Sequence, residues 1–475
     1  MKIIRKTYDR LFIDTTIFIY CSFTAFLLNE IMSIHSYIGE FMKGFIVWGG
    51  IIIAANILEG VKEKKRLQFN KYFSIIFLFI LSYLVTIFIN REQFLMENIK
   101  IWLYMIVLIF VLYGLKEQQN VNIWNCKLKR FFAFFLVCTF ILSTICLLTY
   151  VFQINILIDE PDGYSHIGMY DNRLWGIYNP NVGSSLNALS IIISCGFLIE
   201  KKNKKITFFL IINLLLQYIH LLLTGSRTSF YTTIAGVALF GWFSGFRKIK
   251  TVKRTILCIG VALMIFFSYN PVRNILSYLP IRVNSIEEVD NNTVNENKQE
   301  YETTSEGQVD LERLEKKENR SGGVLTGRTY IWSAGLQAWR EHPLFGISKA
   351  ATYEKASVYI EDPFWLPSLE ASLHNIYITI LVASGIVGLV FFMAFLIANI
   401  INYIKRVFRE EKDYNFNMYI TLLILLAIML VTECMEGRIV YRTEVFNVLF
   451  WTLLGFASQF SMIKERDEMD DKKTI

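Results

Sequence analysis

Two arginines and one histidine stand at the edges of long apolar segments, where charged side chains are few. Arg227 lies in the short turn 224–229, Arg328 opens a segment with apolar residues at helical spacing, and His374 precedes a long apolar run. A guanidinium binds phosphate oxygens through a fork of N–H donors. A neutral imidazole can take a proton from a hydroxyl group near pH 7. These three residues could therefore stabilise a phosphate leaving group while activating a hydroxyl nucleophile.

Each candidate also has a purely structural interpretation. Arg227 could anchor the end of an apolar span by extending its guanidinium to the membrane surface. Arg328 could be an exposed charge at a helix start, although a cation there is mildly unfavourable to the helix dipole. His374 could cap a helix, and Arg173 could be a solvated loop charge. The sequence alone leaves these alternatives open.

The sequence favours chemistry without a metal ion or cofactor. It contains no Cys/His spacing that is typical of a zinc site. The segment Asp159-Glu160-Pro161-Asp162 is interpreted as a solvated acidic loop, because no matching cluster of carboxylates accompanies it. The seven cysteines fall mainly in or beside apolar spans, which disfavours a disulfide framework. We therefore expect neither metal nor cofactor.

The elements that must position these residues are membrane spans. Hydrophobic residues make up 54% of the 475-residue chain. A span needs about 20 mostly apolar residues to cross the hydrocarbon core of a bilayer. About twelve stretches meet this requirement: 11–29, 37–59, 72–90, 97–115, 131–152, 181–199, 206–224, 227–244, 255–271, 374–402, 417–435 and 445–462. We predict an all-α polytopic membrane protein with about twelve transmembrane helices.

Loop charge predicts the orientation of these spans. Lys and Arg concentrate in loops that share a side with the N-terminus, which are 61–71, 116–130, 200–205, 245–254, 403–413 and the tail from 463. Because cytoplasmic loops collect positive residues, both termini are expected in the cytoplasm. The net charge of +7 is thus explained by the orientation of the spans. The basic residues are scattered over many loops and form no single patch, which argues against nucleic-acid binding. The first apolar run is of span length, so no cleavable signal peptide is expected.

One large extracytoplasmic loop, 272–373, separates transmembrane helices 1–9 (1–271) from helices 10–12 and a cytoplasmic tail (374–475). Its part 287–323 is almost devoid of apolar residues and is expected to be disordered. Apolar residues at helical spacing predict an amphipathic helix over 328–340, which Pro343 ends. The remaining part, 347–373, is expected to be irregular. We interpret the working part of the loop as a lid.

Several short motifs occur in a fixed order on the predicted outer face. They are Arg173-x-x-Gly176 with Asn179-Pro180-Asn181, Gly225-Ser226-Arg227, Gly327-Arg328-x-x-x-Trp332, His342-Pro343-Leu-Phe-Gly346, and His374-Asn375 with Gly385-Ile-Val-Gly388. This order resembles the O-antigen ligase and polymerase family of bacterial envelope glycan enzymes, over residues 165–400. The resemblance implies a GT-C-like helical bundle with a cavity beneath the large outer loop. The polar insertion 287–323 departs from the family pattern.

The resemblance also implies a reaction, in which a glycan moves from undecaprenyl diphosphate to an acceptor sugar hydroxyl without a metal. Arg227 and Arg328 would hold the diphosphate, and His374 would act as general base on the hydroxyl. A direct attack of this kind inverts the anomeric carbon. Further substrate contacts are expected from Arg173, Asn181 and Asn375.

Three functions remain open at this point. The favoured function is a polymerase of surface polysaccharide repeat units, such as capsule or exopolysaccharide. A ligase that moves finished polymer to a different acceptor is the first alternative, and a 12-span secondary transporter or lipid-linked oligosaccharide flippase is the second. Expected partners are the lipid-linked donor, the glycan acceptor, the bilayer, and a chain-length regulator and flippase of the same pathway. The expected location is the cell membrane, with the active site outside the cytoplasm.

Overall fold

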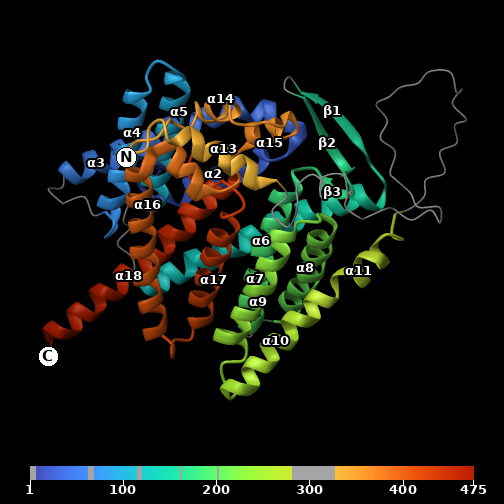
Figure 1. Cartoon of the computed structure of the whole chain (residues 1–475). Helices are drawn as coiled ribbons and strands as arrows, with labels where there is room; N and C mark the ends of the chain where they lie inside the picture. The colour runs from blue at the N-terminus through green and yellow to red at the C-terminus, as the bar shows by residue number, and fades with distance from the viewer. Residues whose placement is uncertain are drawn as a thin grey trace, which may run out of the picture. The chain divides into compact units, whose positions relative to one another are not determined.

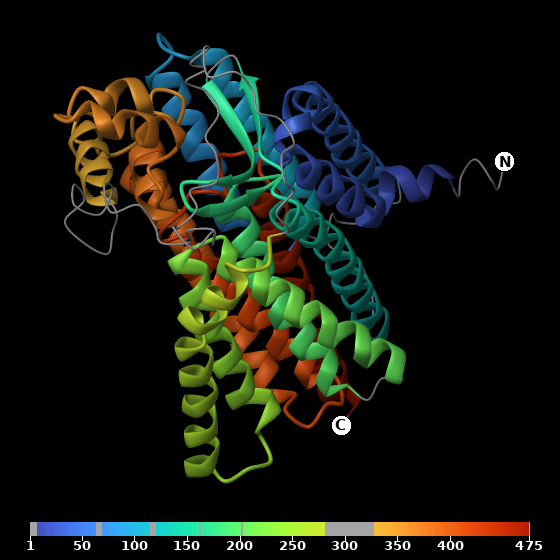
Figure 2. The same cartoon turned by 90° about the vertical axis from the view of Figure 1, so that its right-hand side faces the viewer.

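The protein is a polytopic helical membrane protein, as its hydropathy predicted. The computed structural model describes residues 7–62, 69–114, 120–160, 163–200, 203–280 and 327–474 (Figures 1 and 2). Within these ranges, eight helices are long and apolar enough to cross a membrane, and three more are apolar but shorter. The segment 287–323, for which disorder was expected, lies outside the described residues.

Helices lie over all of the predicted apolar ranges. They are η1 (Asp9–Ile13) and α2 (Thr15–Asn29), α3 (His35–Lys62), α4 (Phe73–Ile89), α5 (Leu95–Leu108) with η3 (Ile109–Gly114), α6 (Val121–Val151), α7 (Pro180–Ile199), α8 (Lys204–Leu223), α9 (Arg227–Phe240) with η4 (Gly241–Gly245), α10 (Thr251–Phe267), α16 (Ile376–Arg409), α17 (Phe416–Thr432) and α18 (Val445–Thr474). Helix α11 (Tyr269–Leu276) follows α10, so helical structure extends beyond the predicted end at 271. The count of about twelve spans stays a prediction, because α2, α4, α9 and α17 are short.

The chain divides into two compact units. Unit 1 comprises Met1–Glu30, Ile34–Phe131 and Lys317–Ile475, and unit 2 comprises Ile31–Ser33 and Phe132–Lys316. In unit 1 the central helix is α18, whose apolar window is 89% buried and which packs against η3, α16, α2 and α17. In unit 2 the central helix is α7, whose window is 83% buried and which packs against α8 and α9.

Polar side chains join the helices of unit 2 inside the apolar bundle. Ser143 Oγ lies 3.1 Å from Asn187 Oδ1, 3.0 Å from Gln217 Oε1 and 3.0 Å from His220 Nδ1. All four residues are fully buried. Hydrogen bonds between side chains contribute to helix association where water is absent. This network therefore holds α6, α7 and α8 together.

Three short strands lie between α6 and α7, in a segment for which the sequence analysis predicted no regular element, and the fold is otherwise mostly helical, as predicted. Strands β1 (Ile156–Glu160), β2 (Gly163–Tyr170) and β3 (Arg173–Gly176) form an antiparallel sheet in the order β1-β2-β3. Asp171 and Asn172 both have positive φ, at 54° and 53°. A two-residue type I′ hairpin loop requires positive φ at both positions, and Asp and Asn tolerate it. The strands were missed because they are only four to eight residues long.

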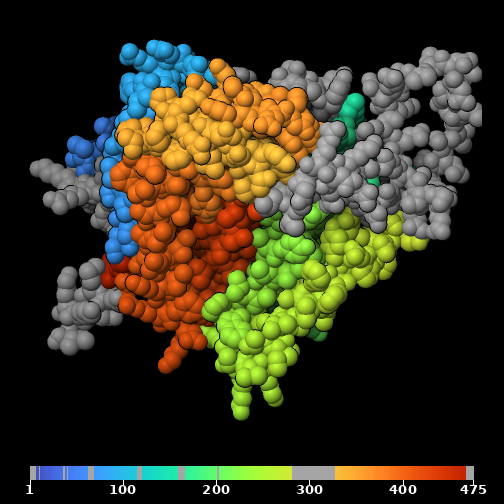
Figure 3. Space-filling model, in the orientation of Figure 1, coloured from blue at the N-terminus to red at the C-terminus, as the bar shows by residue number. Residues whose placement is uncertain are grey.

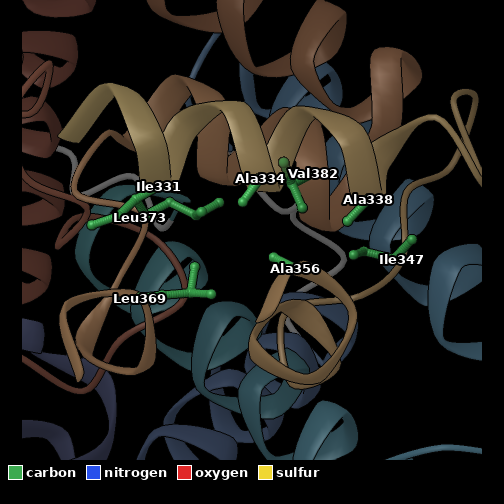
Figure 4. Close-up of a cluster of buried hydrophobic side chains, with 8 residues drawn as sticks. All are labelled: Ile331, Ala334, Ala338, Ile347, Ala356, Leu369, Leu373 and Val382. Carbon is green, nitrogen blue, oxygen red and sulfur yellow. The ribbon is translucent and has the colours of Figure 1, made fainter. Parts of the chain in front are cut away.

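The described part of the loop before α16, residues 327–373, is mostly helical rather than irregular. It contains the predicted amphipathic helix as α13 (Arg328–Trp339), and also α14 (Thr352–Ser357), η5 (Pro363–Trp365) and α15 (Leu366–Ala371). Buried apolar side chains join these elements to α16 (Figure 4), namely Ile331, Ala334, Ala338, Ile347, Ala356, Leu369, Leu373 and Val382. Figure 3 shows residues 327–373, in yellow to orange, as one continuous layer. The expectation of an irregular 347–373 was thus wrong.

A break in α16 receives the loop that follows α13. Gly385 has φ 68° and ψ −172° inside this helix, so the regular backbone bonds end there. The released groups bond instead to the loop 343–348, as Ile347 N to Val382 O, Ser348 N to Ala383 O, Ile386 N to Pro343 O and Val387 N to Leu344 O, at 2.9–3.2 Å. Buried backbone groups need such partners. The break therefore fixes the loop against the start of α16.

Substituting Gly385 with alanine should destabilise the protein. A Cβ atom there would overlap the carbonyl of Leu344, and the positive φ disfavours any side chain. We expect a loss of about 2 kcal/mol or more, measured as a lower midpoint of thermal unfolding in detergent. Gly50→Ala in α3 is the matched control, because a Cβ there meets no atom within 4 Å. Equal midpoints for the two variants would show that the break is not needed.

Candidate active site

His374 lies directly before α16, in a backbone held from several sides. Its φ is 49°, which is uncommon for a residue other than glycine. Its amide donates to Ser372 Oγ at 2.9 Å. On one side Trp332 Nε1 donates to Leu373 O at 2.8 Å, and on the other Ile376 N donates to Glu433 O at 2.9 Å. These bonds fix the position of the His374 backbone, from which the imidazole extends.

Asn375 caps α16. Its Oδ1 accepts from Tyr377 N at 3.0 Å and from Ile378 N at 3.1 Å. Its Nδ2 donates to Cys434 O at 2.9 Å, which ties the start of α16 to the segment after α17. Because both ends of the amide are engaged, the structure gives Asn375 a capping role. Its contact with substrate stays a prediction.

Arg328 is the first residue of α13, whose start packs on the Trp365 ring. Gly327 lies directly against the Trp365 ring, and Tyr330 stacks on the same ring with centroids 5.8 Å apart. The guanidinium Nη2 of Arg328 lies 3.3 Å from Glu436 Oε1. The side chains of Arg328 and Glu436 are only 18% and 11% exposed. The charge at this helix start is therefore partly buried and paired.

One carboxylate faces both Arg328 and His374. Glu436 Oε2 lies 3.6 Å from His374 Nδ1, which is ion-pair distance but long for a hydrogen bond. Burial raises the pKa of Glu436, but the facing His374 and the charges of Arg438 and Arg328 outweigh it and lower the pKa to about 2. Glu436 is therefore ionised at neutral pH. Within the described ranges, His374 Nδ1 is buried and has no hydrogen-bond partner.

A buried ion pair holds the segment that carries Glu436. Arg438 donates from its backbone N to Glu433 Oε2 at 2.7 Å and from Nε to Glu433 Oε1 at 3.2 Å. Their side chains are 4% and 1% exposed, and the guanidinium lies 3.9 Å above the Phe446 ring centroid. Gly437 allows close approach to the backbone before His374, because a Cβ there would lie 3.0 Å from Ser372 Oγ.

The sequence analysis missed Glu433, Glu436 and Arg438. One signal could have revealed them. The motif Glu433-x-x-Glu436-x-Arg438 adjoins an apolar span, at the end where the predicted topology leaves charged residues scarce. Ionisable residues at such a position indicate a functional site by default.

In unit 2, Arg173 joins two of the predicted motifs. Its Nε donates to Thr224 O at 2.7 Å, and its Nη2 donates to Asn181 Oδ1 at 2.8 Å. Its side chain also covers Gly225, where a Cβ would lie 3.4 Å from the Arg173 Cγ. Arg173 thus connects β3, the first turn of α7 and the turn before α9.

Arg227 is the first residue of α9, next to a cluster of hydroxyl groups. Ser229 Oγ lies 2.8 Å from Ser184 Oγ of α7 and 3.3 Å from Ser226 Oγ. The amides of a helix start carry partial positive charge and favour anions. The structure therefore places Arg173, Asn181 and Arg227 around one turn of unit 2, and Arg328, His374 and Asn375 together in unit 1.

The acidic loop of the sequence analysis falls partly outside the described residues, since 161 and 162 are not among them. Across the ranges that are described, no group of three or more His, Cys, Asp or Glu side chains could hold a metal ion.

Part of the chain is similar to known proteins. Residues 206–393 match the family model described as O-Antigen ligase, and this range includes Arg227, Arg328 and His374. "Exopolysaccharide production protein ExoQ" of Rhizobium meliloti (strain 1021) is 30% identical over 94 residues, which cover 19% of this chain and 22% of that protein. The matched segment thus spans about a fifth of the length of this curated relative.

Proposed function

The chain resembles the O-antigen ligase and polymerase family, as its motifs predicted, and from this premise we propose that it transfers a glycan from undecaprenyl diphosphate to an acceptor sugar hydroxyl. The observation that carries the proposal is the Glu436 carboxylate, which faces both the Arg328 guanidinium and the His374 imidazole. This reaction needs a general base and a cation that binds phosphate. His374 and Arg328 are such groups, and Glu436 faces both of them.

The first step of the proposed reaction moves a proton to His374. Glu436 faces Nδ1, so it favours the tautomer that carries its proton there and leaves the Nε2 lone pair as the base. Nε2 takes the proton of the acceptor hydroxyl as the hydroxyl oxygen attacks the anomeric carbon. The ionised Glu436 then stabilises the imidazolium cation that results.

The second part of the reaction is departure of the diphosphate. The bond between the anomeric carbon and the phosphate oxygen breaks, and the electron pair leaves with undecaprenyl diphosphate. We assign Arg227 and Arg328 to the diphosphate, with Arg173 and Asn181 as further contacts. Guanidinium groups bind phosphate oxygens in pairs and keep their charge at all relevant pH values. They can therefore supply charge stabilisation without a metal ion, and attack from the opposite side inverts the anomeric carbon.

Within this reaction class, we favour polymerisation of surface polysaccharide repeat units. The relative whose name refers to exopolysaccharide production supports a polysaccharide product. A ligase that delivers finished polymer to another acceptor uses the same donor chemistry and is the alternative. We place the reaction on the outer face of the cytoplasmic membrane, with both chain ends in the cytoplasm, because of the charge of the loops.

Deletion of the gene tests this assignment through the lipid-linked intermediate that accumulates. A polymerase predicts single repeat units on the outer leaflet, and complementation with the wild-type gene should restore polymer. Full-length lipid-linked polymer in the deletion strain would support the ligase. Repeat units that collect on the cytoplasmic leaflet would overturn the proposal and favour a transporter.

Replacing Glu436 with glutamine should reduce the rate of transfer by about 10- to 100-fold, because the imidazolium loses its anionic partner. The same substitution should also change how the stability of the fold depends on pH.

The folded-state pKa of Glu436, about 2, lies below the ordinary 4.5. The ionised carboxylate therefore stabilises the fold above pH 4.5, and this stabilisation is lost as the pH falls toward 2. Thermal unfolding of the wild type and the variant between these pH values measures the difference.

Glu341→Gln is the matched control for this substitution. Glu341 also forms an ion pair, with Lys355 at 3.1 Å, but its side chain is 36% exposed. We expect this variant to keep the wild-type rate and unfolding profile. A Glu436→Gln variant that behaves like Glu341→Gln would remove Glu436 from the mechanism.

A further inference from the structure

Three aromatic rings gather on the hairpin β2–β3. The His166 and Tyr170 rings stack, with centroids 3.7 Å apart and planes at 11°. The Trp175 ring meets both nearly edge-on, with centroids 6.2 Å from His166 and 5.7 Å from Tyr170. All three side chains are partly exposed. The cluster is therefore an aromatic surface at the edge of unit 2 rather than a sealed core.

A bend in β2 brings these rings together. Residues 166 and 170 are four apart, so an extended strand would separate them by about 13 Å. Gly168 has φ 103°, and the pairing register shifts between Gly168 and Met169. A Cβ at Gly168 would overlap the carbonyl oxygen of Ile154. Glycine is thus required at this bend, which folds the strand so that His166 and Tyr170 meet.

The cluster holds a hydrogen-bond donor that needs an acceptor. Trp175 Nε1 is buried, and among the described residues it has no hydrogen-bond partner. An indole N–H can only donate, and a buried donor that is left unpaired is destabilising. Burial lowers the pKa of His166, so the neighbouring ring is neutral at pH 7. The cluster therefore combines partly exposed, uncharged rings with one buried N–H group that is unsatisfied.

A sugar ring fits this combination better than a lipid chain or a charged group. Its C–H face packs on aromatic rings, and its hydroxyl and ring oxygens accept hydrogen bonds from an indole. A lipid chain offers no acceptor to Trp175, and a phosphate would leave the ring faces unused. The chemistry of the cluster thus points to a carbohydrate ligand.

The position of the cluster indicates which sugar it would bind. Tyr170 pairs directly with Arg173 across the hairpin, and Trp175 follows Arg173 by two residues in β3. Directly paired residues and alternate residues of a strand share one face of a sheet. Arg173 also holds the turn before Arg227 through its bond to Thr224 O. We propose that His166, Tyr170 and Trp175 form the subsite for the sugar that is attached to the donor diphosphate.

This inference rests on the proposed function. Binding measurements with two lipids distinguish a failure of the subsite from a failure of the proposed function. The probes are undecaprenyl diphosphate without a glycan and the lipid-linked repeat unit that accumulates in the deletion strain. Binding of each to the purified full-length protein in detergent is measured for every variant. Tyr170→Leu and Trp175→Leu should weaken binding of the glycan-bearing lipid by about tenfold and leave binding of the bare lipid unchanged.

Two further variants sharpen the result. Trp175→Phe keeps an aromatic ring but removes the N–H group. It should weaken the binding of the glycan-bearing lipid by about fivefold and leave the binding of the bare lipid unchanged. Arg227→Ala should weaken both lipids, because both carry the diphosphate. Phe208→Leu is the matched control, since this α8 side chain is 66% exposed and should affect neither lipid.

Other outcomes would overturn the subsite. If Tyr170→Leu and both Trp175 variants bind the two lipids as the wild type does, the rings do not touch the sugar. If the variants lose affinity for both lipids equally and also unfold at lower temperature, the rings only support the hairpin. A wild-type protein that binds neither lipid would contradict the proposed function, and the subsite with it.

Discussion

Replacing His374 with alanine should lower the rate of glycan transfer by about 10²- to 10⁴-fold, the range that general base catalysis contributes. The variant lacks the imidazole that would take the acceptor proton, while Glu436 and Arg328 keep their own contact at 3.3 Å. Binding of the lipid-linked donor should therefore change little. Single-turnover rates and donor affinity, measured on the same purified protein, separate these two effects.

The matched control is His342→Ala. This histidine lies in the same outer segment but is exposed, and no role in the reaction is assigned to it. It should retain the wild-type rate. A His374→Ala variant that is as active as His342→Ala would show that another group removes the acceptor proton.

Replacing Arg328 with alanine should lower the rate by about 10²- to 10³-fold, as expected when one preorganised donor to a developing anion is removed. The loss should appear in kcat as well as in donor affinity, because the charge on the diphosphate grows as the bond breaks. The substitution also leaves Glu436 facing only His374 and the Arg438 charge. Steady-state kinetics over a range of donor concentrations measure both parameters.

Arg328→Lys should not restore the rate of transfer, because an ammonium group is a point charge and cannot form the paired hydrogen bonds of a guanidinium. Arg340→Ala is the control on the same helix, since this residue follows α13 at its other end and is exposed. We expect it to have wild-type kinetics. Full activity of Arg328→Lys would contradict a paired contact with the diphosphate.

Local signals in the sequence predicted the elements that carry the candidate residues. Apolar residues at helical spacing placed the helix that begins at Arg328, and the apolar run predicted from 374 placed the start of α16, which begins at Ile376. Such features depend on neighbours within one or two helical turns. For the same reason the position of His374 directly before a helix could be predicted without knowledge of the fold.

The partner of these residues could not be predicted in this way. Glu436 lies 108 positions from Arg328, and nothing in the local pattern connects the two. The break at Gly385 could not be predicted either, because the backbone groups that it releases bond to a loop far earlier in the sequence, 343–348. Long-range pairings of this kind depend on tertiary packing and not on periodicity.

The bend in β2 shows a further limit. Strict alternation predicts that residues 166 and 170 are well separated along a strand. Only the positive φ of Gly168 and the shifted register bring the rings together. A glycine in the sequence indicates that such a bend is allowed, but the Ile154 carbonyl that requires glycine there is visible only in the fold.

The most direct test of the proposed function is mass spectrometry of the lipid-linked products formed by purified full-length protein. The protein is incubated in a chelator with undecaprenyl-diphosphate-linked repeat units, which serve as both donor and acceptor. We expect chains of two or more repeats, with one undecaprenyl diphosphate released for each new linkage. Unreacted repeat units and no released undecaprenyl diphosphate, from protein that still binds the donor, would contradict glycan polymerisation as the function.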